Sequence, residues 1–87
     1  HYAVAMKWEQ AVMSAPMVTA KGQDNIAARI RELAQENEVP IIENKPLARA
    51  LFAEVEIGDV IPERYWEVVA LVLAEVYRMT GRSAEAV

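Results

Sequence analysis

Cysteine is absent from this chain, and the only histidine is His1. The lack of cysteine excludes a disulfide framework and thiolate chemistry, and it fits a reducing compartment. With a single histidine, a metal site would depend on carboxylates, and these are scattered along the sequence. Only three glycines are present, and no glycine-rich phosphate loop occurs. We therefore predict that the chain uses no metal or other cofactor.

Long apolar runs and an excess of basic charge are also missing. Glu, Lys or Arg interrupts every apolar run, so no window approaches the roughly 20 apolar residues of a membrane span. No signal-peptide pattern opens the chain. Thirteen acidic residues outnumber nine basic ones, which gives a formal net charge of −4. This balance argues against a nucleic-acid partner and, mildly, against docking on an anionic membrane surface.

The chain of 87 residues is the size of one small domain. A domain of this size buries only about 60–65% of its surface, so its core is thin. There is no internal repeat. We predict a single domain over residues 1–80 and a frayed tail over residues 81–87.

Residues 1–8 alternate between two kinds of side chain. Tyr2, Val4, Met6 and Trp8 point one way, and the alanines and lysine between them point the other way. This period of two predicts a strand with one large apolar face and one small face. Such a strand should not begin at a free terminus. We therefore expect it to lie inside a sheet, beside a strand formed by residues upstream of His1 in a longer chain.

The remaining elements follow from apolar spacing, helix caps and proline positions. Strand, helix and strand in this order favour an α/β domain. We predict a small sheet of three to four short strands packed by three main helices, and completed by the upstream strand. The predicted segments are a loop Glu9–Pro16, strands Met17–Ala20 and Pro40–Glu43, and helices Asp24–Asn37, Leu47–Val55 and Pro62–Thr80.

Within these elements, Asp24 is a candidate N-cap or first-turn acid of its helix. The buried stripe of that helix should comprise Ile26, Ala27, Ile30, Leu33 and Ala34, and Arg31 should lie on its solvent side. The last helix is apolar over so wide an arc that it either packs on two sides or carries an exposed binding face. Trp8 and Trp66 are interpreted as core.

The opening residues carry a family resemblance. His-Tyr-Ala-Val-Ala at residues 1–5 resembles the stretch that follows Asn-Pro-Thr in the flagellar and type III secretion export switch proteins, the FlhB/YscU family. In that family Asn-Pro-Thr-His marks an autocleavage site, and His1 matches its fourth residue. The Asn, Pro and Thr are not in this sequence.

Three further stretches are similar to the same family: Met13–Gly22, Val39–Leu51 and Glu56–Pro62. The run Pro-Leu-Ala-Arg-Ala-Leu inside the second stretch is the most specific, and the matches together cover residues 1–78. Tyr2 and the Met-Ser-Ala-Pro loop look flagellar rather than injectisome-like. Two departures are Met17, where the family usually has lysine, and the end of the sequence soon after the last helix.

The resemblance implies a cytoplasmic domain of a bacterial inner-membrane protein. It implies a role in the protein export gate, which changes from early to late substrates after autocleavage at an Asn-Pro bond upstream of His1. The implied partners are its own N-terminal cleavage fragment, other export gate proteins and rod- and hook-type export substrates. The chain would not be a turnover enzyme, because asparagine cyclisation cleaves the parent chain only once.

Family position also implies site residues. His1 belongs to the cleavage motif, and the alternative is a plain strand-end residue. The residues expected to support the cleavage loop are Glu43, Pro46, Leu47, Ala48 and Arg49. The residues expected to receive export substrates are Ala15, Pro16, Ala70 and Leu73.

Alternatives remain open at the level of the sequence. Ala70 and Leu73 fit plain core as well as a binding patch, and Arg49 could be a solvated arginine without a fixed partner. The competing function is a small α/β ligand-binding or enzyme domain. Against it stands the lack of a nucleophile, base and orienting residue in the sequence.

Overall fold

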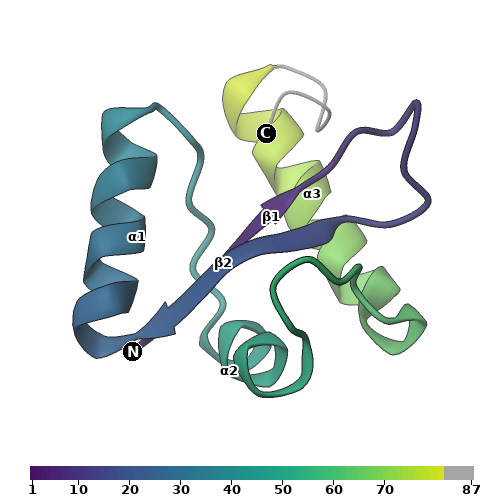
Figure 1. Ribbon diagram of the computed structural model, residues 1–87. Helices are drawn as coiled ribbons and strands as arrows, with labels where there is room; N and C mark the ends of the chain where they lie inside the picture. Colours follow the sequence, from purple (N-terminus) through teal and green to yellow (C-terminus); the bar gives the residue numbers. More distant parts are fainter. Residues whose placement is uncertain (82–87) are drawn as a thin grey trace.

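The computed structural model describes residues 1–81, and Figure 1 shows their arrangement. Of the predicted tail, only Gly81 lies within the described residues; it ends the last helix with φ 68°. Within residues 1–81 no helix is long and apolar enough to cross a membrane. The elements are β1 (Tyr2–Lys7), β2 (Met17–Gln23), α1 (Asp24–Glu36), α2 (Lys45–Glu54), the short 3₁₀ helix η1 (Glu63–Tyr65) and α3 (Trp66–Thr80).

The sheet of the described chain has two antiparallel strands, β1 and β2. The predicted alternation of β1 is confirmed, because Val4 and Met6 pack against the core and the Tyr2 ring lies 4.9 Å from that of Phe52. The large face of β1 therefore looks toward α2 and α3. The core cluster on that side joins residues of β2, α2, α3 and the segment between the two helices: Val18, Leu47, Leu51, Val55, Ile61 and Val69.

The small face of the sheet admits α1 at close range. Gly22 lies opposite Ala3 in the register, and a Cβ at Gly22 would fall 2.1 Å from Cγ2 of Ile26. A side chain at Gly22 would therefore force Ile26 at the start of α1 to shift. In Figure 1, α1 lies to one side of the strands and α3 to the other, so helices cover both faces. The strand Met17–Gln23 also extends beyond the predicted Met17–Ala20, because Gly22 is a packing position and not a strand end.

The α/β class and the three main helices are confirmed, but the predicted strand Pro40–Glu43 is wrong. Residues 39–44 form no strand, and they line a cavity along β1 without pairing to it. Pro40 has no N–H to donate to a ladder, and β propensity alone does not create a partner. Apart from its pairing with β1, strand β2 has only an isolated bridge between Met17 and Val60.

One helix detail agrees with the prediction and two differ from it. Asp24 is the first-turn acid of α1, while Gln23 holds the N-cap position; Asp24 has φ 52°, and its N–H donates to the His1 carbonyl at 2.8 Å. Helix α2 begins before Leu47, because the Asn44 side chain caps it by accepting from the Leu47 N–H at 3.1 Å. Helix α3 is preceded by the 3₁₀ turn where Pro62 was expected to start a continuous helix.

The buried stripe of α1 is rotated in part from the predicted one. Ala27 is fully buried and Ile30 and Ala34 are half-buried, as predicted, whereas Ile26 and Leu33 are 61% and 41% exposed. The small side chain of Ala27 fits against the sheet, and the larger residues lie at the rim of the contact. This rotation brings Arg31 to a half-buried position, where the sequence predicted solvent.

Candidate functional site

One edge of the sheet is open. The far edge of β2 is covered near its start, since the Val18 N–H donates to Asp59 and the Gly58 N–H donates to Val18. Just before β1, the His1 carbonyl accepts a hydrogen bond from the Asp24 N–H, which follows β2. Main-chain groups of successive strand residues point to opposite edges, so the N–H and carbonyl groups of Tyr2 and Val4 point away from β2, to the other edge of β1. No strand of residues 1–81 pairs with that edge.

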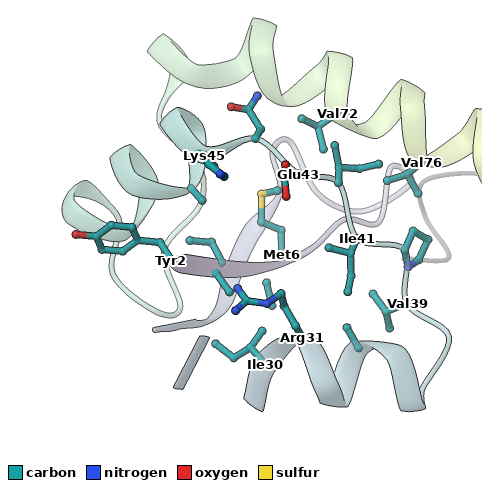
Figure 2. A pocket seen from close by; sticks show the side chains of 18 of the residues that line it. Tyr2, Met6, Ile30, Arg31, Val39, Ile41, Glu43, Lys45, Val72 and Val76 are labelled. Carbon is teal, nitrogen blue, oxygen red and sulfur yellow. The ribbon is translucent and has the colours of Figure 1, made fainter. Parts of the chain in front are cut away.

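A cavity of about 520 Å³ runs along this open edge, and we call it the β1 slot. Figure 2 shows α3 above the β1 slot and α1 below it, with Met6 and Ile41 directed into the gap. The β1 slot is lined by residues 1–6, by Ile30, Arg31 and Ala34 of α1, by residues 39–45 and Ala48, and by Val72, Leu73 and Val76 of α3.

The residues that line the β1 slot would suit an extended peptide segment. Ile30 and Ala34 supply apolar surface on the α1 side, and Val72 and Val76 supply it on the α3 side. The open edge of β1 supplies main-chain donors and acceptors between these two walls. A strand placed there would therefore be largely apolar on both faces and hydrogen-bonded along one edge.

The charged groups of the β1 slot are few. Arg31, Glu43 and Lys45 contribute side chains to its lining, and none of them has a hydrogen bond or ion pair within residues 1–81. Arg31 rises from α1 toward β1 in Figure 2. No group of three or more potential metal-ligating side chains occurs in the described part of the chain.

The residues expected to support the cleavage loop lie in two different environments, the β1 slot and helix α2. His1 and Glu43 are exposed and line the β1 slot, and half-buried Ala48 also lines it. Leu47 is a core residue of α2, 8% exposed. Pro46 lies in the first turn of the same helix.

Arg49 is exposed and does not line the β1 slot. The bond expected between Arg49 and Glu43 is not formed among the described residues. Any support that Arg49 gives to a cleavage loop would therefore involve groups outside residues 1–81.

The four residues expected to receive substrates differ in exposure. Ala15 is 2% exposed and Pro16 is buried, so neither offers its side chain to a partner. Leu73 is half-buried against the core, and Ala70 is exposed on α3. Ala70 is thus not core, which was the alternative interpretation, and the open part of the predicted patch lies on α3.

Sequence reasoning did not assign to the site the residues that extend this exposed face. Trp66 and Tyr77 share the Ala70 side of α3 and are 42% and 56% exposed. Trp66 was predicted as core, but its indole N–H reaches the Ile61 carbonyl at 2.8 Å and holds the ring at the surface. The wide apolar arc of the last helix was the sequence signal, and the exposed face is its outcome.

One polar cluster lies away from the β1 slot, between the end of α2 and η1. The Tyr65 hydroxyl donates to Glu54, and the Arg64 guanidinium donates to the same carboxylate at 2.6 and 3.2 Å. These hydrogen bonds, that of Tyr65 first, lower the pKa of the Glu54 carboxyl below its ordinary value. The cluster ties two elements together on the surface, and it does not line the β1 slot.

Comparison with known proteins agrees with this architecture. The flagellar biosynthetic protein FlhB of Borreliella burgdorferi is 54% identical over 82 residues, covering 94% of this chain and 22% of that protein. The FlhB of Bacillus subtilis is 47% identical over 78 residues, covering 90% and 22%. This chain therefore spans about a fifth of the length of these relatives.

Solved structures and a family profile extend the similarity to the fold. The crystal structure of the cytoplasmic domain of FlhB from Shewanella putrefaciens has a TM-score of 0.87 and 42% identity, covering 95% of this chain and 67% of that one. The profile described as the FlhB HrpN YscU SpaS family matches residues 1–76. This chain belongs to the FlhB HrpN YscU SpaS family.

Proposed function

We propose that this chain is a regulatory domain of a flagellar type III protein export gate, and that it lies on the cytoplasmic side of a membrane-anchored parent protein. The proposal is supported by the family match and by relatives that are named flagellar biosynthetic proteins. The similar Shewanella structure is described as a cytoplasmic domain. Other export gate proteins would be its neighbours.

The observation that carries the proposal is the β1 slot. A strand formed by residues upstream of His1 would fill it and pair with the open edge at Tyr2 and Val4. A short connection between neighbouring strands requires an antiparallel pair, so the connecting turn would lie next to His1. That turn is where the family motif Asn-Pro-Thr-His would fall.

Self-cleavage at that turn needs no protease. The asparagine side-chain nitrogen attacks its own main-chain carbonyl carbon, a succinimide closes, and the bond to proline breaks. The proline nitrogen takes up a proton as the attacking amide loses one, and water later opens the succinimide. Two strands that fix the turn would supply the proximity this reaction needs. His1 would orient the turn or relay the proton.

Substrates of the early, rod- and hook-type class would dock on the exposed part of α3. Ala70 and Leu73 would contact them directly, while Ala15 and Pro16 would hold the neighbouring loop in place from buried positions. Cleavage would then change the export preference from early to late substrates by loosening the upstream strand. In this role the chain undergoes one self-cleavage and no catalytic turnover.

A second candidate function is a small ligand-binding or enzyme domain, and the volume of the β1 slot favours it. About 520 Å³ is within the range of small-molecule sites. In that case the β1 slot would stay open in the parent protein. Protection of the β1 edge therefore separates the two candidates.

The test is hydrogen exchange on the parent protein in its natural length, with the upstream residues present. We expect slow exchange at the Tyr2 and Val4 amides, which the open edge of this chain leaves without a strand partner. Intact mass should reveal two fragments, and replacing the asparagine before the Asn-Pro bond should leave one. Fast exchange at both amides would overturn the strand proposal, and a single uncleaved mass in the unmodified parent would overturn self-cleavage.

A further inference from the structure

The side chain of Arg31, the half-buried cation of the β1 slot, forms no ion pair or hydrogen bond within residues 1–81. Arg31 lies on α1 among apolar neighbours such as Ile30 and Ala34, and its guanidinium rises toward β1 (Figure 2). No carboxylate of residues 1–81 lies within ion-pair distance of it. A guanidinium partly withdrawn from water without a carboxylate loses solvation and gains nothing in return.

The charge balance around Arg31 is opposite to that of the chain. The whole chain has a net charge of −4, whereas Arg31 and Lys45 face a single carboxylate, Glu43, in the β1 slot. Neither Lys45 nor Glu43 forms an ion pair within the described residues. The β1 slot therefore favours an occupant that brings negative charge.

We infer that the strand filling the β1 slot carries an aspartate or glutamate whose carboxylate pairs with Arg31. The inference rests on the proposed function, in which the occupant is the segment upstream of His1. Planar guanidinium and carboxylate groups match in two parallel hydrogen bonds, which fixes position as well as affinity.

The pair would set the register of the added strand. Both walls of the β1 slot are apolar, so a slip of the occupant by two residues would leave its apolar packing nearly unchanged. A slip of that size would separate the carboxylate from Arg31 by about 6.8 Å, two strand rises. Arg31 thus selects one register, and it slows the departure of the upstream fragment after cleavage.

The experiment measures the release of the upstream fragment from the cleaved parent protein. Arg31→Met should speed release roughly tenfold to hundredfold, as for loss of a charge-assisted hydrogen bond, and Arg31→Lys should fall in between. Arg29→Met is the matched control, because Arg29 lies on the exposed side of α1 and pairs with Glu32. Its release rate should equal that of the unmodified protein.

Two further measurements distinguish a pair from general packing. Added salt should speed release from the unmodified protein and leave the Arg31→Met rate almost unchanged. Neutralising each carboxylate of the upstream segment in turn should identify one variant with the Arg31→Met rate. If Arg31→Met releases the fragment at the unmodified rate, the inference is overturned and the strand proposal stands. If the unmodified protein never retains the fragment, the proposed function itself fails.

Discussion

The ammonium nitrogen of Lys21 lies 2.9 Å from the main-chain oxygen of Phe52 and 2.9 Å from that of Val55. Both carbonyls belong to the C-terminal end of α2, where helix carbonyls lack intrahelical partners. A lysine of β2 thus caps a helix that is far away in sequence. Its side chain is 16% exposed, and its charge also suits the negative end of the helix dipole.

Replacing Lys21 by methionine should therefore lower the free energy of unfolding by about 1.5–3 kcal/mol, since two carbonyls lose a charged donor. Urea unfolding measures the change. Lys7→Met is the control, because Lys7 is 51% exposed and pairs with Glu9 at the surface. Equal effects of the two substitutions would show that the Lys21 cap contributes nothing beyond a surface ion pair.

The Glu54 cluster predicts a pH dependence. The folded-state pKa of Glu54 is depressed, so its contribution to stability is present above the ordinary value of 4.5 and is lost as pH falls through the folded pKa. Tyr65→Phe removes the largest single cause and should raise the pKa of Glu54 toward 4.5, and Arg64→Gln, which removes a hydrogen bond and a charge, should raise it as well. Carboxyl NMR titration gives these values. An unchanged Glu54 pKa in Tyr65→Phe would contradict the hydrogen bond.

Some elements of this fold could be predicted from the sequence, and others could not. The strand at residues 1–8 and the helix at 62–80 were accessible because alternation and 3.6-residue spacing are local properties. The predicted strand at residues 40–43 is wrong because pairing depends on a partner strand, and none lies beside it within residues 1–81. Apolar spacing at residues 40–43 carries no information about such a partner, whereas the alternation of residues 1–8 predicted one upstream of His1.

The candidate site divides in the same way. The wide apolar arc of the last helix left two alternatives, packing on two sides or an exposed face, and exposed Ala70 and Tyr77 favour the second. The sequence predicted Arg31 on the solvent side of α1, because hydropathy put Ile26 and Leu33 in the buried stripe beside Ala27. In the structure Ile26 and Leu33 are exposed, whereas Arg31 is half-buried and lines the β1 slot.

The surface position of Arg49 changes what its replacement should do. With an exposed side chain and no partner in residues 1–81, Arg49→Ala should leave the urea midpoint of this chain unchanged. In the parent protein it should slow self-cleavage if Arg49 braces the turn. The half-life of the uncleaved band measures this, with Arg78→Ala as the control. Identical half-lives would remove Arg49 from the cleavage-loop support.

The exposure of Ala70 makes it the informative position of the proposed substrate patch. Ala70→Asp should leave the domain folded, because the side chain points to solvent, and should reduce export of rod- and hook-type substrates. Ala28→Asp, an exposed alanine on α1, is the matched control and should export normally. Ala15→Asp would bury a charge at a position that is 2% exposed, so it should unfold the domain and cannot test the patch.

The binding behind this effect should be weak, because an exported substrate must leave again. A small apolar face of this kind supports dissociation constants from about micromolar to millimolar, or roughly −8 to −4 kcal/mol. Titration of an early-substrate segment should show saturable binding to the unmodified domain and to Ala28→Asp, and little binding to Ala70→Asp. Normal export by a folded Ala70→Asp variant would place substrate recognition elsewhere on the gate.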